Sequence, residues 1–228
     1  MVTLKYGVQR TLCNLLGNLL AIILLTFSPN VAAAEDRVVI AALGDSLIQG
    51  FGLPLEDGFV PQLNNWLEQK GANATVINAG VSGDTTAGGL ARLDWTLSPE
   101  VDGLIVALGG NDLLRGIAPE TVAANLDAIL AGARAKGLPV LLVAQQAAAN
   151  YGAQYQADFD AIYPMLATKY QVPMSASFLS LLSQTEGDLS AIRPYLQGDN
   201  IHPNAAGVAM IVSAIGPDVL RLVHAISD

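Results

Sequence analysis

The sequence predicts an α/β protein in which helices cover both faces of a parallel sheet, a three-layer α/β/α sandwich. Four short runs are rich in branched residues and apolar at successive positions, which is typical of strands buried on both faces. Stretches with apolar residues at helical spacing alternate with these runs. Such alternation builds a parallel sheet, because each helix returns the chain to the end at which the previous strand began.

The predicted elements follow one another along the whole chain after about residue 36. The predicted strands are 37–43 (RVVIAAL), 74–78 (ATVIN), 103–108 (GLIVAL) and 139–145 (PVLLVAQ), with a short edge strand near Val172. The predicted helices are 58–71, 85–97, 119–137, 155–170 and 203–226. The third helix has Pro119 near its start and Gly137 at its end, as helices favour. Trp66 and Trp95 fall in the first two helical patterns, and both are expected to be packed.

Residues 1–34 have the layout of a secretory signal peptide. Lys5 and Arg10 precede the apolar run LLGNLLAIILLTF, and Ala32 and Ala34 form an A-x-A pattern. The apolar run is short for a membrane span of about 20 residues. We expect cleavage after Ala34 and a periplasmic or secreted protein, with an uncleaved N-terminal anchor as the alternative. Residues 35–228 are then expected to form one domain.

Charge and cysteine content argue against several classes of function. The net charge is −9, and loss of the two basic residues of the signal segment makes it −11, so phosphate backbones and anionic lipid are repelled. We therefore expect no nucleic-acid partner and no stable membrane insertion after cleavage. Cys13 is the only cysteine, so the mature chain has no disulfide, thiolate nucleophile or cysteine metal site. With 52% hydrophobic and 14% charged residues, the chain can bury one large core.

Four polar clusters follow the predicted strands or precede the last helix. They are GDS (44–46), NAGVSGDT (78–85), GGND (109–112) and GDNIHPN (198–204). In an open parallel sheet, the loops after the strands meet at one edge, and ligands bind there. We expect these clusters to line one crevice.

The first and last clusters contain the groups for nucleophilic catalysis. A serine such as Ser46 attacks a carbonyl only if a base takes its proton. His202 lies in a polar loop, whereas His224 lies on an amphipathic helix and is expected to be packed or solvated. Asp199, three residues before His202, can reach one imidazole nitrogen and fix the tautomer. The structural alternatives are that Asp45 or Ser46 caps a helix and that the aspartate caps a turn.

The two middle clusters offer donors for an oxyanion. Acyl transfer needs N–H groups aimed at the negative charge that develops on the carbonyl oxygen. The backbone N–H groups of Ser46 and Gly83 and the side-chain amide of Asn111 can supply them. Taken singly, Gly83 and Asn111 are also ordinary turn residues.

Together the stretches GDSL, NAGVSGDTTAGG, GGNDLLRG and DNIHPN resemble the four blocks of the SGNH (GDSL) hydrolase superfamily. The likeness is to its small bacterial arylesterase and lysophospholipase-like acyl-CoA thioesterase branch. This resemblance implies a flavodoxin-like fold with a five-stranded sheet of order 2-1-3-4-5 and ester hydrolysis without a metal or other cofactor. It also implies specific roles: a catalytic triad of Ser46, Asp199 and His202, and an oxyanion hole of Ser46, Gly83 and Asn111.

Two stretches depart from the family's pattern. ANYG at 149–152 is similar to the family's substrate-side loop, which places Asn150, Tyr151 and Gly152 near the substrate, but the preceding AQQAA lacks the expected proline. The shape of the acyl pocket is therefore left open. Asp199 is followed by Asn200, where glycine is more usual.

Two further functions remain as alternatives to an exported esterase or thioesterase acting on small acyl compounds. A carbohydrate O-deacetylase of the same superfamily uses the same chemistry, although no exposed aromatic platform for a sugar is evident. A non-catalytic flavodoxin-like domain could use Asp45, Asp84 and Asp112 to hold a divalent cation and an anionic ligand. That second alternative leaves His202 and Asn111 without a role. The sequence does not indicate the oligomeric state.

Overall fold

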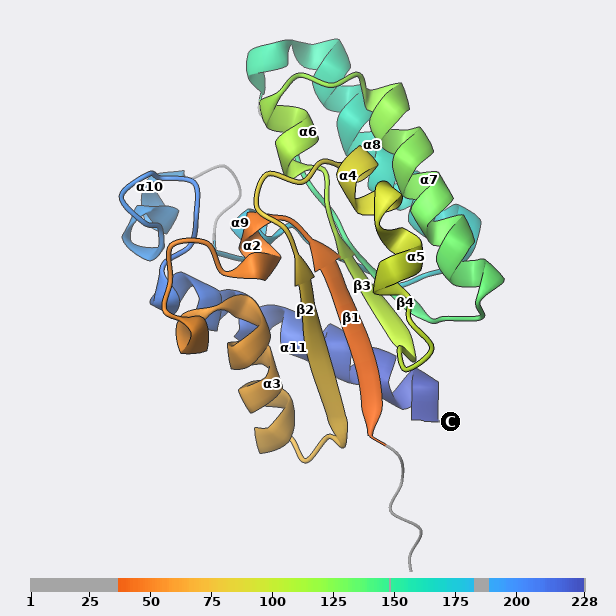
Figure 1. Ribbon diagram of the computed structural model, residues 1–228. Helices are drawn as coiled ribbons and strands as arrows, with labels where there is room; N and C mark the ends of the chain where they lie inside the picture. Colours follow the sequence, from red (N-terminus) through yellow and green to blue (C-terminus); the bar gives the residue numbers. More distant parts are fainter. Residues whose placement is uncertain (1–36, 148, 183–188, 228) are drawn as a thin grey trace, which may run out of the picture. The chain divides into compact units, whose positions relative to one another are not determined.

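A five-stranded sheet forms the middle layer of the structure. The computed structural model describes residues 37–147, 149–182 and 189–227, so the predicted signal peptide lies outside the described residues. The strands pair in the order β2-β1-β3-β4-β5, and every pair is parallel (Figure 1). The predicted parallel sheet and its flavodoxin-like order are confirmed. The strands are β1 (Val38–Gly44), β2 (Ala74–Gly80), β3 (Gly103–Ala107), β4 (Val140–Val143) and β5 (Met174–Ser175).

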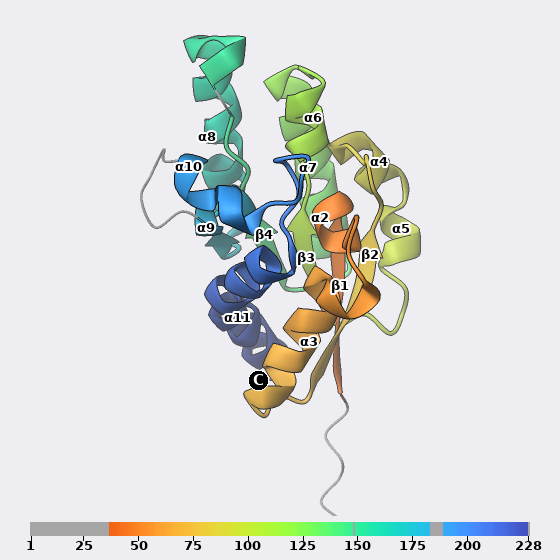
Figure 2. The same ribbon diagram turned by 90° about the vertical axis from the view of Figure 1, so that its left-hand side faces the viewer.

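Helices cover both faces of this sheet, as predicted. On one face lie α3 and α11, and on the other lie α4, α5, α7 and α8 (Figures 1 and 2). The long helices are α3 (Phe59–Gln69), α7 (Pro119–Ala135), α8 (Ala153–Tyr170) and α11 (Ala205–Ser227). The short helices are α2 (Ser46–Gln49), α4 (Thr86–Ala91), α5 (Leu93–Thr96), α6 (Gly110–Leu114), α9 (Phe178–Leu182) and α10 (Leu189–Ile192). Single 3₁₀ turns lie at Leu55–Asp57, Ala149–Tyr151 and Arg193–Tyr195.

The continuous apolar runs of the sequence are explained by the two-sided core. In β1, Ile40 and Ala42 pack on the side of α3 and α11, whereas Ala41 and Leu43 pack on the side of α7 and α8. Successive side chains of a strand point to opposite faces, so a strand covered on both sides is apolar at every position. Helix α11 is the one described helix long and apolar enough to cross a membrane, yet half of its most apolar window is buried in this core.

The register of the sheet brings the ends of three strands to one level. Gly44 at the end of β1 is paired with Gly80 of β2 and with Ala107 of β3. The loops that follow these strands therefore leave the sheet together, and they carry three of the four polar clusters of the sequence. This alignment builds the candidate site.

Three details differ from the sequence prediction. The helix expected over 85–97 is two short helices, α4 and α5, because the backbone of Arg92 leaves the helical region (φ −109°, ψ 10°). Trp95 on α5 is 88% exposed, so its predicted packing was wrong; the four-residue helix buries Leu93 and Thr96 instead. Trp66 does pack against the core. The edge strand β5 begins at Met174, two residues after Val172.

Candidate active site

Ser46 is the first residue of α2 and lies just beyond the end of β1. The cap of this helix is Asp45, whose Oδ1 accepts a hydrogen bond from the backbone N–H of Leu47 at 3.0 Å. The serine hydroxyl is therefore not used for capping. Instead, Oγ of Ser46 lies 2.8 Å from Nε2 of His202.

The other ring nitrogen of His202 is bound by Asp199. Its Nδ1 lies 2.7 Å from Oδ2 of Asp199, while Oδ1 accepts the backbone N–H groups of Ile201 at 2.9 Å and of His202 at 3.0 Å. The hydrogen bond from the imidazole, and then these two N–H groups, lower the pKa of Asp199 to about 2. An ionised carboxylate at Nδ1 favours the tautomer that carries its proton there, which leaves Nε2 as the acceptor facing the serine.

The loop that carries His202 is held from two sides. Asn200 adopts a left-handed conformation with φ of 58°, which asparagine tolerates better than most residues, so it can stand where glycine is more usual. Gln197 donates from Nε2 to the carbonyl oxygens of Phe51 at 2.8 Å and Pro203 at 2.9 Å. The ring of Phe51 lies against the imidazole, with 4.7 Å between the centroids. These contacts join the loop to the segment that follows α2.

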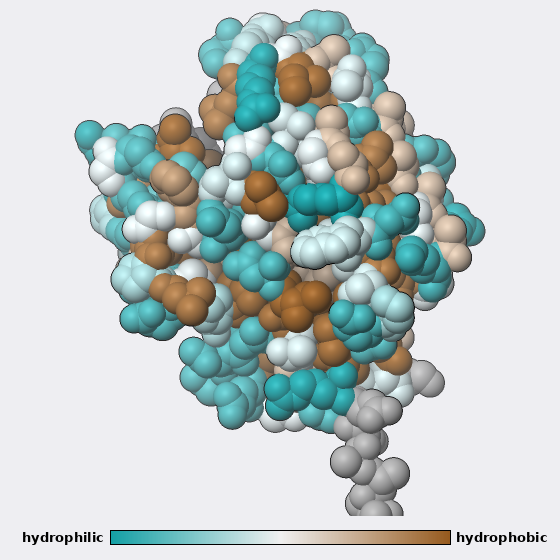
Figure 3. All heavy atoms as spheres, viewed as in Figure 1, coloured by the Kyte–Doolittle hydropathy of each residue, from teal (hydrophilic) through white to brown (hydrophobic). Residues whose placement is uncertain are grey.

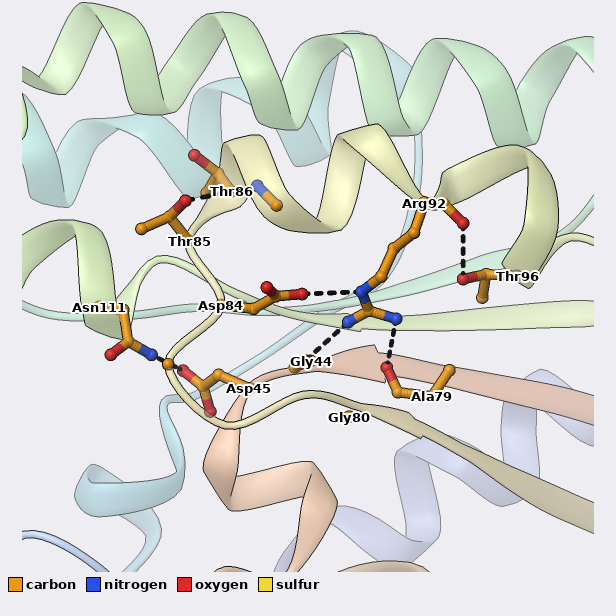
Figure 4. Close-up of polar contacts among 12 residues, drawn as sticks. Gly44, Asp45, Ala79, Gly80, Asp84, Thr85, Thr86, Arg92, Thr96 and Asn111 are labelled. Atoms are coloured by element: carbon orange, nitrogen blue, oxygen red, sulfur yellow. Dashed lines mark hydrogen bonds and ion pairs between the residues drawn. The ribbon is translucent and has the colours of Figure 1, made fainter.

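The predicted oxyanion donors line the same cavity as Ser46 and His202. Within the described part of the chain, the backbone N–H groups of Ser46 and Gly83 have no protein acceptor. Asn111 at the start of α6 donates from Nδ2 to Oδ2 of Asp45 at 3.3 Å (Figure 4). Because that nitrogen carries two hydrogens, one remains for a ligand. Burial raises the pKa of Asp45, and its hydrogen bonds oppose this shift.

Gly83 has a backbone conformation that explains its residue type. Its φ is 81°, in the left-handed region that favours glycine. Nη2 of Arg115 donates to its carbonyl oxygen at 2.7 Å, which fixes the peptide bond to Asp84. The three donors thus come from three segments that follow β1, β2 and β3 at the carboxyl end of the sheet.

The cavity beside Ser46 has a volume of about 350 Å³. Tyr151 does not line it but donates from its hydroxyl to the carbonyl oxygen of Leu114, a lining residue, at 3.2 Å. Asn150 and Gly152 are exposed and also lie outside the lining. The apolar residues that line the cavity are Leu47, Phe51, Leu113, Leu114, Leu179 and Ile201.

The carboxylates considered for a cation site have separate partners. Asp84 pairs with Arg92 at 2.7 Å, and Asp112 accepts from the backbone N–H of Thr86 at 2.8 Å and from its hydroxyl at 2.6 Å. Over residues 37–147, 149–182 and 189–227, the carboxylate, histidine and cysteine side chains form no group of three that could hold a metal ion. This geometry does not favour the cation-binding alternative.

Sequence reasoning missed the residues that support the site. Gln197, Phe51 and Arg115 contact the loops of the site, and a single sequence gives no signal for such contacts. For Arg92 the sequence gives one weak indication of a supporting role: it closely follows the glycine-rich stretch that contains Gly83.

Comparison with known proteins agrees with this architecture. The model of the GDSL-like lipase/acylhydrolase family matches residues 42–210. The chain is 37% identical to esterase TesA of Pseudomonas aeruginosa, covering 91% of this chain and 98% of that protein. It is 35% identical to thioesterase 1/protease 1/lysophospholipase L1 of Escherichia coli K12, covering 90% of this chain and 92% of that protein. The crystal structure of AlinE4, an SGNH-hydrolase family esterase, superposes with a TM-score of 0.65 at 42% identity. The match covers 81% of this chain and 96% of AlinE4. The chain therefore belongs to the GDSL-like lipase/acylhydrolase family of carboxylic ester hydrolases.

Proposed function

We propose that this protein is an exported serine hydrolase that cleaves small acyl esters or thioesters through an acyl-enzyme. The observation that carries the proposal is the unbroken series from Ser46 Oγ to His202 Nε2 at 2.8 Å and from His202 Nδ1 to Asp199 at 2.7 Å. Three N–H donors line the same cavity. A nucleophile, a base, an orienting carboxylate and an oxyanion hole are the parts that acyl transfer needs.

In the first half of the reaction, Ser46 Oγ attacks the carbonyl carbon of the substrate while Nε2 of His202 takes the hydroxyl proton. The carbonyl oxygen becomes an oxyanion, which accepts hydrogen bonds from the N–H groups of Ser46 and Gly83 and from the Asn111 amide. The bond to the leaving group then breaks, and the alcohol or thiol departs with the proton from His202. Asp199 stabilises the imidazolium without taking its proton.

In the second half, water replaces the leaving group. His202 takes a proton from the water as the water attacks the acyl-enzyme carbonyl, and the same donors hold the second oxyanion. Collapse of this intermediate releases the carboxylic acid and returns the proton to Ser46. No step requires a metal ion or another cofactor.

The substrate class follows from the size and lining of the cavity. A volume of about 350 Å³ lies near the lower end of small-molecule sites, and six apolar side chains line it. This space suits a short acyl chain. The similar proteins named esterase and thioesterase support both oxygen and sulfur leaving groups. Contact of Asn150, Tyr151 and Gly152 with the substrate stays a prediction: none of the three lines the cavity, and Tyr151 binds the carbonyl oxygen of Leu114, which does.

A hydrolysis panel tests the proposal. p-Nitrophenyl esters of increasing chain length are compared with acyl-CoA thioesters and acetylated sugars, with Ser46→Ala as the blank. Hydrolysis of esters or thioesters supports the proposal. Hydrolysis of acetylated sugars alone indicates the deacetylase instead. A protein that cleaves none of these and binds magnesium by calorimetry would be the non-catalytic domain.

We further propose that residues 1–34 are a signal peptide and that residues 35–228 are the mature hydrolase domain. The order of charged, apolar and small-residue regions supports this division. The intact mass of the exported protein tests it, with a mature chain beginning at Glu35 as the expected result. A chain that keeps residues 1–34 would be anchored at the membrane instead.

A further inference from the structure

Arg92 joins three segments of the chain close to the candidate active site (Figure 4). Its guanidinium donates from Nε to Asp84 Oδ2 at 2.7 Å, from Nη1 to the carbonyl oxygen of Ala79 at 2.7 Å, and from Nη2 to that of Gly44 at 2.9 Å. The side chains of Arg92 and Asp84 are only 21% and 18% exposed. A partly buried guanidinium with three hydrogen bonds holds its partners more firmly than a surface ion pair does.

These partners adjoin the proposed oxyanion donors in the sequence. Gly44 is two residues before Ser46, and Asp84 directly follows Gly83. One planar group therefore ties the end of β1 to the loop between β2 and α4. The donors of a guanidinium point in fixed directions, which the single ammonium of lysine cannot reproduce.

The residues around Arg92 leave space for its ion pair with Asp84. A Cβ atom at Gly88 would lie 2.5 Å from Oδ1 of Asp84, so a side chain there would displace the carboxylate. The interruption between α4 and α5 falls at Arg92 itself. The later end of the loop is anchored separately, because the carboxylate of Asp112 accepts hydrogen bonds from the backbone N–H and the hydroxyl of Thr86. Loss of Arg92 therefore removes the anchor of Asp84, next to Gly83, while Arg115 still holds the carbonyl oxygen of Gly83 and Asp112 still holds Thr86.

We propose that Arg92 and Asp84 are positioning residues that fix the backbone N–H groups of Ser46 and Gly83 relative to each other. This inference rests on the proposed function, because it concerns the oxyanion hole of that reaction. Neither residue lines the cavity beside Ser46, so neither contacts the substrate. They act through the position of the two donors.

A misplaced oxyanion donor lowers kcat more than it weakens substrate binding, because the oxyanion exists only near the transition state. Complete loss of one donor costs about 10² to 10³ in kcat. A donor that is displaced but still present is expected to cost less, so Arg92→Ala should lower kcat by about 10- to 100-fold. KM should change by less than about threefold.

The surroundings of Arg92 allow chemical rescue. Arg92 lines a groove of about 890 Å³ together with residues of β2 and α5, and this groove shares no lining residue with the cavity of Ser46. Strand β2 and helix α5, whose residues line this groove, lie towards the viewer in Figure 1, and Figure 3 shows hydrophobic side chains gathered near the middle of the same face. A small guanidinium ion can therefore reach the space left by Arg92→Ala without entering the active-site cavity.

The experiment measures kcat and KM for a p-nitrophenyl ester in the wild type, Arg92→Ala, Arg92→Lys, Asp84→Asn and the Arg92→Ala/Asp84→Asn double variant. Competent sites are counted by fluorophosphonate titration, so that kcat refers to folded enzyme only. Arg221→Ala is the matched control, because Arg221 pairs with Asp218 on the surface of α11, far along the chain from both loops. Each variant is repeated with millimolar methylguanidinium, well below the molar range in which guanidinium unfolds proteins.

The inference is supported if both single variants lose at least about tenfold in kcat per titrated site, with the losses not additive in the double variant. Methylguanidinium should then raise kcat of Arg92→Ala and leave the wild type and Arg221→Ala unchanged. If kcat per titrated site stays within about threefold of the wild type, or if only KM changes, the inference is wrong while the proposed function stands. A wild type that is neither active nor labelled would overturn both.

Discussion

Nε2 of His202 lies 2.8 Å from Oγ of Ser46, although 156 residues separate them in the chain. The contact joins the loop after the first strand to the loop before the last helix. A hydrogen bond of this length lets the imidazole take the serine proton as Oγ attacks a carbonyl.

Replacement of either partner should abolish hydrolysis. Ser46→Ala removes the nucleophile and His202→Ala removes the base, so each should lower kcat by at least about 10⁴-fold. A fluorophosphonate should add covalently to Ser46 in the wild type. The activity is measured with a p-nitrophenyl ester, and circular dichroism shows whether each variant is folded.

The chain offers matched controls for this prediction. His224, the other histidine, is exposed on α11, so His224→Ala should keep full activity. Ser82 also lines the cavity, and Ser82→Ala should still be labelled. Peptide mapping that placed the label on Ser82, or a chelator that stopped the reaction, would contradict the assignment.

Asp199→Asn should impair catalysis while leaving the fold intact. The amide can keep the hydrogen bonds from the backbone N–H groups of Ile201 and His202, but it no longer favours the tautomer with the proton on Nδ1. We expect kcat to fall by up to about 10⁴-fold. Asp158→Asn, an exposed change on α8, is the control and should leave kcat unchanged. A decrease of only a few-fold would mean that Asp199 is a turn residue.

Asn111→Ala should lower kcat by about 10² to 10³, because one preorganised donor to the oxyanion is lost. KM should change little, since the donor acts mainly in the transition state. Asn65 is exposed on α3, and Asn65→Ala serves as the control. If kcat of Asn111→Ala stays within a few-fold of the wild type, the amide only pairs with Asp45.

Leu114→Ala should change chain-length preference. Leu114 is 62% exposed and lines the cavity, so a longer acyl chain can cover it whereas an acetyl group does not reach as far. Removal of this apolar surface should lower kcat/KM for longer p-nitrophenyl esters about tenfold relative to acetate. Leu55→Ala, at another exposed leucine, should leave the ratio unchanged. Equal losses on all esters would mean that the acyl chain lies elsewhere.

The fold could be predicted because its determinants are local. Val38–Gly44 is apolar at nearly every position, and only a strand covered on both faces has that pattern without helical length. The order of the strands needed the family resemblance as well. The split at Arg92 and the exposure of Trp95 could not be predicted, because helical periodicity encodes neither the hydrogen bonds of Arg92 to Gly44 and Ala79 nor the shortness of α5.

The candidate site was predictable to the same degree. Ser46 and Asn111 begin short helices directly after strands, and His202 lies in the loop before the last helix, so their positions follow from the order of the elements and from the family pattern. Which carbonyl and carboxylate oxygens Gln197 and Arg92 bind depends on tertiary packing, so their supporting roles needed the structure. The lining of the cavity by Leu113 and Leu114 also needed the structure, and contact of residues 150–152 with the substrate stays a prediction.

The charge on Asp199 should also make stability depend on pH. Its pKa is lowered from 3.8 to about 2 in the folded protein, first by the hydrogen bond from His202. A carboxyl group with a lowered folded pKa stabilises the fold above its unfolded pKa, and this stabilisation is lost as the pH falls through the folded value. The difference in urea midpoint between the wild type and Asp199→Asn should therefore be constant above about pH 5, decrease as the pH falls below about 4, and approach zero only as the pH falls below the folded pKa of about 2. In a His202→Ala background the same difference should be smaller, because the main cause of the shift is gone. A difference that persists unchanged at pH 2 would show that the carboxylate charge of Asp199 is not its source.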